Sequence, residues 1–390
     1  MAIYLDHAAT TPLRPELIDG YVAQLQVIGN PSSVHGSGQS ARQAVEDARD
    51  KLAKAVDCHR SEVLFTSGGT EGNNLAIKGL YLATRKADSA RNVVITVGTE
   101  HHAGIEPVEW LESAEAAEVV WVPVSESGVV DLAWLEAYLV DNSSRVALIS
   151  MMWVNNETGL ITPIPQVTAL AKAYGIPVHS DGVAAFGHIP LSFKGSGLAT
   201  MAISGHKFGA PVGIGALIVA RDAKLAVISH GGGQERGIRS GTLSSPLAYA
   251  IGEAAALAEA EIGEVESRVA GFAKQIIDFV LKTAPDAVYS RGTNPGVGGI
   301  VHFTFPGCSG DSLLFLLDSA GVSVSTGSAC RAGVAQASHV LMAMGRTEDQ
   351  ARGSLRISLG YTTTAEDVQS FIDAFPAAYT GAHKAGLPSR

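Results

Sequence analysis

The sequence of 390 residues contains little cysteine and no long apolar run. Its three cysteines, Cys58, Cys308 and Cys330, are an odd and sparse set, which argues against a disulfide framework and favours a reducing cytoplasm. The longest apolar stretch, residues 146–154, is far shorter than the roughly 20 residues of a membrane span. Residues 1–6 show neither the basic patch nor the apolar stretch of a secretory signal. We therefore expect a soluble cytoplasmic protein that has no membrane partner.

The chain also lacks an excess of basic charge. It has 28 lysine and arginine residues against 38 aspartate and glutamate residues, which argues against a surface that binds nucleic acid. Small molecules or other proteins are the expected partners. A chain of this length is too long for one hydrophobic core and suggests two domains.

Short apolar segments alternate with amphipathic helical segments through the first half of the chain. This pattern predicts an α/β fold in which helices cover both faces of a mostly parallel sheet. The expected strands lie at residues 62–66, 92–96, 119–122, 145–150, 177–180, 201–204 and 213–219. This alternation of strands and helices ends after residue 219. A connecting helix at 245–270, strands near 299–305 and 355–359 and a helix from 365 predict a smaller second α/β domain, and residues 380–390 are expected to fray.

The segment TSGGTE at residues 66–71 follows an expected strand and opens a helix. The free N–H groups of Gly69 and Thr70 would then lie at a positive helix N-terminus, where an anion such as a phosphate binds well. An ordinary strand-to-helix turn would explain this segment equally well if it stood alone. Ser204 and His206 could reach the same anion from another loop, and Thr242 offers a further hydroxyl group.

Lys207 lies in the segment SGHKFG at residues 204–209, and Asp181 ends an apolar strand 26 positions upstream. A buried, unpaired carboxylate is costly, so a cationic ring nitrogen would compensate Asp181. The alternative is that Asp181 caps the turn that follows it. A lysine that can form a Schiff base, an acid for a pyridinium and a phosphate cradle are what pyridoxal phosphate requires of a protein.

Further polar residues follow other strands of the expected sheet. His101 could stack on a ring or move protons, or it could be an ordinary loop residue. Asn156 follows the strand at 145–150. Ligands of open α/β sheets collect at the carboxyl ends of the strands, so these residues are expected to meet. Arg356 lies within a strand and would need a carboxylate, either from a substrate or from an internal salt bridge.

Cys330 lies in STGSACRAG at residues 325–333, a loop of small residues in which Arg331 would favour the thiolate. The alternative is a buried cysteine that acts as a small apolar residue, which we expect for Cys58 and Cys308. A nucleophilic thiol in an enzyme that uses pyridoxal phosphate indicates sulfur chemistry.

Nine segments together resemble the cysteine desulfurases of the iron–sulfur-assembly type, which are fold-type I enzymes related to class V aminotransferases. The segments are residues 5–12, 29–35, 66–71, 99–101, 154–157, 204–207, 230–236, 239–242 and 327–330. The resemblance extends from the first strand to about Gly360. It implies a large domain with a mostly parallel seven-stranded sheet at 16–262, a smaller C-terminal domain at 263–390 and an N-terminal segment at 1–15 that packs with the smaller domain.

The resemblance also implies a role for each candidate residue. Lys207 would carry the cofactor, Asp181 would pair with the pyridinium, and His101 would stack on the ring and assist proton transfer. The phosphate would be bound by Gly69, Thr70, Ser204 and His206, and Thr242 from the second subunit of a homodimer would also reach it. The cofactor and the substrate carboxylate would be oriented by Asn156, Asn30 and Arg356.

The implied reaction converts L-cysteine to L-alanine and leaves a persulfide on Cys330. The persulfide would pass to a sulfur-acceptor protein, such as an iron–sulfur scaffold or a thiolation protein. We expect no metal site, apart from Cys330 as a transient ligand of an iron–sulfur cluster.

One position departs from the pattern of the resembling family. That family has His-x-Asp-x-x-Gln, in which the glutamine donates to the phenolic oxygen of the cofactor, whereas this chain has Ala184 at the last position. Alanine has no side-chain donor. The alternatives are therefore a specialised desulfurase with altered activity, another fold-type I enzyme such as a C–S lyase or aminotransferase, or a scaffold without catalytic activity.

Overall fold

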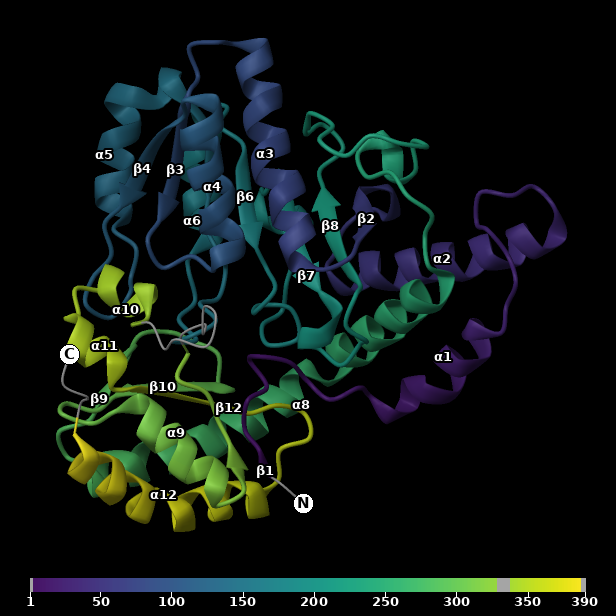
Figure 1. The fold of residues 1–390 in the computed structure, drawn as a ribbon. Coiled ribbons are helices and arrows are strands. Elements are labelled where there is room, and N and C mark those ends of the chain that lie inside the picture. The colour runs from purple at the N-terminus through teal and green to yellow at the C-terminus, as the bar shows by residue number, and fades with distance from the viewer. Residues whose placement is uncertain (1–2, 328–336, 387–390) are drawn as a thin grey trace.

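The computed structural model describes residues 3–327 and 337–386. Its largest element is a seven-stranded sheet with the order β2-β8-β7-β6-β5-β3-β4 (Figure 1). Only β8 runs antiparallel to its two neighbours. The strands are β2 (Val63–Thr66), β3 (Val93–Val97), β4 (Glu118–Val122), β5 (Val146–Ser150), β6 (Val178–Asp181), β7 (Thr200–Ser204) and β8 (Gly215–Val219). The expected mostly parallel sheet of a fold-type I enzyme is therefore confirmed.

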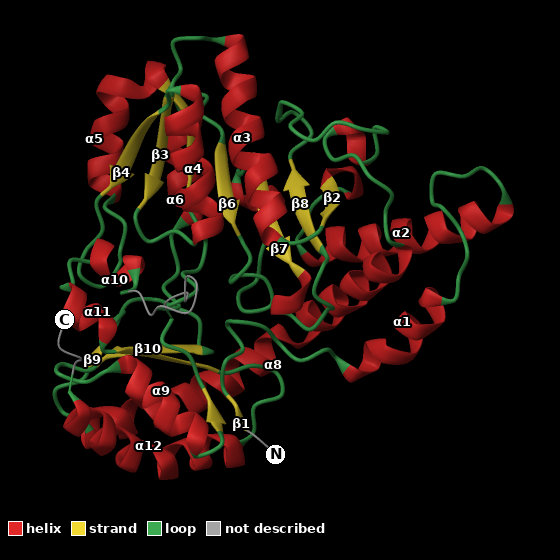
Figure 2. Ribbon diagram, in the orientation of Figure 1, coloured by secondary structure: helices red, strands yellow, loops and turns green. Residues whose placement is uncertain are grey.

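Helices cover both faces of this sheet (Figure 2). Successive residues of β3 show why: Val93 and Ile95 pack into one apolar cluster with α5 and α6, whereas Val94 packs into another with α3 and α4. A strand that is apolar at every position is typical of a sheet buried on both sides. The helices around the sheet are α2 (Gly36–Ala55), α3 (Gly69–Ala87), α4 (His102–Glu115), α5 (Leu132–Asn142), α6 (Ile164–Lys172) and α7 (Phe193–Ser196), whereas α1 (Ile18–Leu25) packs against α8 (Ser245–Thr283).

A second core lies below the first in Figure 1. Its aromatic centre includes Phe303, Phe305, Phe371 and Phe375. Its elements are β1 (Ile3–Tyr4), β9 (Val288–Tyr289), β10 (Ile300–Thr304), β11 (Val322–Ser323), β12 (Ser354–Ser358), α9 (Gly310–Ser319) and α12 (Ala365–Ala385). Helices α10 (His339–Ala343) and α11 (Glu348–Arg352) form a separate small apolar cluster. Strand β1 pairs in parallel with β11, and Leu5 belongs to this core. The domain boundaries given above remain a prediction.

Helix α8 (Ser245–Thr283) joins the two cores and is longer than the sequence pattern indicated. Its first half buries Ile251 in the large core, and its second half buries Val269 and Ile276 in the small one. The predicted end at residue 270 was wrong because the buried face changes from one core to the other without a break in the helix.

The prediction that the tail frays from residue 380 was also wrong as far as Ala385, where α12 ends. Ala378 and Ala382 are buried against the second core, and the Tyr379 hydroxyl donates to Asp286 (2.8 Å). These contacts hold the last turns in place. No helix within the described residues is both long and apolar enough to cross a membrane.

Candidate active site

A cavity of about 440 Å³ lies at the carboxyl ends of the parallel strands, next to the N-terminus of α3. The residues expected at strand ends line it together, as the parallel topology predicts. These lining residues are Gly69, Thr70, His101, Asn156, Asp181, Ser204, His206 and Lys207. Ala184 also lines the cavity, so the position that departs from the family pattern faces the same space.

Lys207 ends a short 3-10 helix (Gly205–Lys207) that follows β7. Its Nζ atom donates to the carbonyl oxygens of Ala8 (2.5 Å) and Ala9 (2.9 Å). Burial and the nearby Arg356 guanidinium lower the pKa of Lys207 to about 8, although Asp181 and Asp6 act in the opposite direction. A lysine with a lowered pKa is partly neutral near pH 7, which makes it a competent nucleophile towards a carbonyl group.

Asp181 is 5% exposed at the end of β6. Its Oδ1 atom accepts from the backbone N–H of Val183 (2.9 Å), and its Oδ2 atom accepts from Nδ2 of Asn73 (2.6 Å). The first bond is the turn cap that the sequence offered as an alternative. Both donors are uncharged, so neither neutralises the carboxylate, and a cation from the cavity would do so.

The start of α3 forms a narrow cradle. A Cβ atom at Gly69 would lie 2.6 Å from Cγ2 of Val183 and 3.6 Å from Cβ of Ser204, so glycine allows the close approach of these segments. The first N–H groups of a helix have no partner within the helix and attract anions. Ser204 and His206 line the same space. The residues present therefore fit a phosphate group.

Two histidines of the cavity are held in the neutral form. Burial and the nearby Lys207 lower the pKa of His206 to about 4. Burial also lowers the pKa of His101, whose Nδ1 atom accepts from the backbone N–H of Ala103 (3.0 Å) and caps α4. Because Nδ1 serves as an acceptor, the ring proton of His101 is assigned to Nε2.

Asn156 has a buried Oδ1 atom without a hydrogen-bond partner in the described part of the chain. Buried polar atoms are normally paired, and this one belongs to a residue that lines the cavity. An unpaired polar atom beside the lysine, acid and anion cradle is consistent with a bound polar cofactor.

Three predicted residues within the described ranges, Asn30, Thr242 and Arg356, do not line the cavity of their own chain. Asn30 is exposed in the segment between α1 and α2, where its Oδ1 atom accepts from the N–H of Ser32 (2.9 Å). Thr242 is exposed in the segment before α8. Arg356 forms an internal salt bridge with Asp6 (2.9 Å) and donates to the carbonyl oxygen of Asn156 (2.9 Å). The salt-bridge alternative for Arg356 is therefore present.

Two of the three cysteines, Cys58 and Cys308, lie in the described part of the chain. Cys330 lies outside the described residues. Cys308 is buried, and burial raises its pKa to about 11. Cys58 is half-buried, and burial raises its pKa to about 12. Both therefore remain thiols at neutral pH, as expected for cysteines that serve as small apolar residues.

The sequence did not indicate Asn73, the donor to Asp181. It indicated Glu157 only as part of the polar segment after a strand, with no role of its own, and this carboxyl group is 2% exposed beside Arg356. Asn73 could have been found from its position on the helix. It lies one turn after Gly69 and therefore shares the helix face that begins at the cradle.

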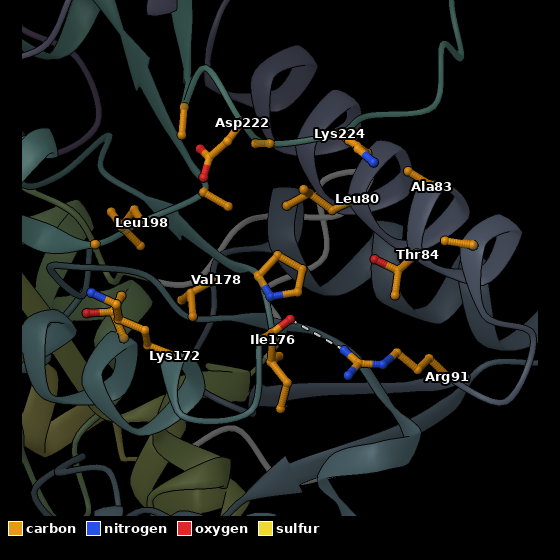
Figure 3. Close-up of a pocket in the computed structure, with 18 of the residues that line it drawn as sticks. Leu80, Ala83, Thr84, Arg91, Lys172, Ile176, Val178, Leu198, Asp222 and Lys224 are labelled. Carbon is orange, nitrogen blue, oxygen red and sulfur yellow. Dashed lines mark hydrogen bonds between the residues drawn. The ribbon is translucent and has the colours of Figure 1, made fainter.

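A second hollow, of about 510 Å³, lies at the other end of α3 (Figure 3). Arg91 donates to the carbonyl oxygen of Gly175 (3.4 Å) in this hollow. None of the predicted site residues lines it in the described ranges. The predicted site residues that line a cavity in the described ranges therefore lie at the N-terminal end of α3.

A model of the aminotransferase class-V family matches residues 3–371, and this family is the class of protein that the fold and the site define. The "IscS-like cysteine desulfurase" of Mycobacterium tuberculosis is 46% identical over 98% of both chains. The "Cysteine desulfurase IscS" of Dictyoglomus turgidum is 39% identical over 95% of this chain and 93% of its own. The NifS-like protein of Rickettsia africae has a solved structure with a TM-score of 0.86, 31% identity and coverage of 97% and 100%. The chain therefore belongs to the class-V aminotransferase family and, within it, to the cysteine desulfurases of the IscS type.

Proposed function

We propose that this protein removes sulfur from L-cysteine with pyridoxal phosphate and leaves L-alanine and a persulfide on Cys330. One observation carries the proposal: a single cavity gathers Lys207, Asp181 and the N-terminus of α3. Its relatives are named cysteine desulfurases, and one solved relative, 30% identical with a TM-score of 0.79, is described as "SspA in complex with cysteine". These relatives do not favour a C–S lyase or an aminotransferase.

Each part of the cofactor has residues that would hold it. Lys207 would bind its aldehyde carbon, and Asp181 would pair with its ring nitrogen. Its phosphate would lie against Gly69, Thr70, Ser204 and His206, and His101 and Asn156 would contact the ring. When bound, the cofactor withdraws electrons from the substrate's Cα atom and so makes the loss of a proton from that carbon possible.

The protein residues supply the remaining steps. The Nζ atom of Lys207, with its pKa lowered to about 8, can exchange a proton with the substrate near neutral pH. The neutral His101 holds a proton on Nε2 and can donate a hydrogen bond from it. The Cys330 thiolate would attack the substrate sulfur, so that a new S–S bond forms while the C–S bond breaks. The electron pair of the broken bond remains on the carbon fragment, which takes up protons and becomes alanine.

Arg356 would bind the substrate carboxylate on the side that Asp6 does not use. The Nε atom of Arg356 is buried and has no hydrogen-bond partner among the described residues. A guanidinium group can pair with one carboxylate through NH2 and offer other N–H groups to a second carboxylate. A substrate carboxylate there would satisfy the unpaired donor.

The proposed assembly is a homodimer in which the partner supplies Thr242 and Asn30. Both residues are exposed and lie outside the cavity of their own chain. Helix α1 contains no buried residue, and Ile18, Val22 and Leu25 are 45%, 47% and 59% exposed. A second copy of the chain would cover this apolar surface. A sedimentation profile that shows only monomer would contradict the assembly.

We further propose a cytoplasmic location and transfer of the persulfide sulfur to an iron–sulfur scaffold or a thiolation protein. The support is the family resemblance and the names of the relatives as IscS-type desulfurases.

The deciding experiment measures alanine and sulfide after the purified full-length protein, loaded with pyridoxal phosphate, is incubated with L-cysteine and a thiol reductant. We expect both products in equal amounts, and neither from Lys207→Ala. Production of sulfide at an unchanged rate by Cys330→Ala would indicate a C–S lyase instead. Yields no higher than those of Lys207→Ala would refute the proposal.

A further inference from the structure

A continuous chain of hydrogen bonds leads from Asp181 to the buried Thr200 at the start of β7. Asn73 of α3 donates to Asp181 Oδ2 (2.6 Å), and its own Oδ1 lies 3.0 Å from Nε2 of His179. The other ring nitrogen of His179, Nδ1, lies 2.9 Å from Oγ1 of Thr200 on β7. Asn73, His179 and Thr200 are each 0% exposed.

The direction of every bond in this chain can be assigned. Asn73 must present its NH₂ group to Asp181, because a carboxylate cannot donate. Its carbonyl oxygen therefore faces His179 and accepts from Nε2. Burial lowers the pKa of His179 to about 3, so the ring is neutral and carries one proton. With that proton on Nε2, Nδ1 is the acceptor for the Thr200 hydroxyl. All three donors consequently point towards Asp181.

A buried histidine between an amide and a hydroxyl could serve packing alone. Two features go beyond that role. The chain ends on the only charged side chain of the four, and that side chain lines the cavity together with Asn73, whereas His179 and Thr200 do not. Aligned donors polarise one another and favour negative charge at the end of the chain. Hydrogen bonds to the charged form of a carboxylate also stabilise that form.

We propose that Asn73 and His179 are positioning residues, which hold the Asp181 carboxylate oriented towards the cavity so that the ring nitrogen of the cofactor keeps its proton. The inference rests on the proposed role of Asp181. Thr200 completes the chain by fixing the tautomer of His179. The residues of this hydrogen-bond chain come from three elements, because α3 crosses the sheet next to β6 and β7. Asn73 of α3 faces β6, the strand that carries both His179 and Asp181.

The test compares cofactor affinity and the pH titration of the bound cofactor's visible absorbance in full-length variants. Asn73→Leu removes both hydrogen bonds at similar volume. Thr200→Val removes only the last donor, and Thr200→Ser retains it. Thr168→Val is a matched control, because the buried Thr168 hydroxyl donates only to backbone carbonyl oxygens (2.5 Å to Ser196) away from the cavity.

We expect Asn73→Leu to weaken cofactor binding about ten-fold or more, as for the loss of one hydrogen bond to a charged group. Its absorbance titration should differ from that of the native protein, because the ring nitrogen loses its proton more readily. Thr200→Val should show the same changes at about two-fold to five-fold, and Thr200→Ser and Thr168→Val should match the native protein. Turnover should fall through kcat more than through KM.

Folding is checked by circular dichroism on each variant. If Asn73→Leu does not fold, the comparison of Thr200→Val with Thr200→Ser decides the inference. A folded Asn73→Leu, or a Thr200→Val, with native affinity and native titration would overturn it. Asp181→Asn separates the two proposals: if this change also leaves cofactor binding and turnover unaltered, the role of Asp181 in the proposed function is wrong.

Discussion

Glu157 offers a sharp test of the electrostatics around the site. The residue follows β5 and is 2% exposed. Its Oε2 atom accepts from the hydroxyl of Ser338 (2.5 Å), the N-cap residue of α10. Burial raises the pKa of Glu157 to about 7, although the Ser338 hydroxyl and Arg356 act in the opposite direction. Ser338 comes eight positions after Cys330 in the sequence, so Glu157 holds a residue close along the chain to the proposed sulfur acceptor.

The raised pKa of Glu157 makes the free energy of unfolding depend on pH in a definite direction. Because the folded protein binds this proton more tightly than the unfolded chain, Glu157 contributes stability that is fully present below pH 4.5 and lost as the pH rises through about 7. The difference between an ordinary value of 4.5 and about 7 corresponds to roughly 3 kcal/mol. Buried histidines with lowered pKa values, such as His179, have the opposite sign, since their contribution is lost as the pH falls below about 6.5.

Glu157→Gln isolates the contribution of this carboxyl group, because glutamine keeps an acceptor for Ser338 but does not ionise. We expect the unfolding free energy of the variant to rise relative to the native protein by roughly 3 kcal/mol between pH 5 and pH 8. Urea unfolding at four pH values measures this difference, with the exposed Glu136→Gln as the control. A constant difference between native protein and Glu157→Gln across the range would refute the reasoning.

Four further outcomes are expected. Lys207→Arg should abolish turnover and the visible absorbance of the bound cofactor, whereas Cys330→Ala should retain that absorbance in a spectrophotometric titration but form no persulfide, as shown by mass spectrometry. Ala184→Gln should raise kcat several-fold in the alanine assay, because one added hydrogen bond is worth about 1 kcal/mol. Arg49→Met should lower stability in urea unfolding by about 3–5 kcal/mol, because it leaves the buried carboxylate of Glu235 without its partner (2.8 Å).

The strand pattern and the rule that ligands bind at strand ends were sufficient to predict the sheet and most of the cavity. Local patterns could not predict contacts between distant segments. Asn73 and Asp181 are 108 positions apart, and Arg356 and Asp6 are 350 positions apart. The sequence indicated that Arg356 needs a carboxylate, but only the fold shows that Asp6 on the N-terminal segment supplies one.

The charges around the cavity explain why Asp181 is the residue that would bind a cation there. Arg356 already pairs with Asp6, and burial keeps His206 and His179 neutral. Lys207 donates to two backbone carbonyl oxygens and has a lowered pKa, so its own positive charge is weakly held. Asp181 is thus a buried carboxylate whose assigned donors are all uncharged. A cationic ring nitrogen would gain the full benefit of that charge in a site of low polarity, while Lys207 could release its proton at little cost.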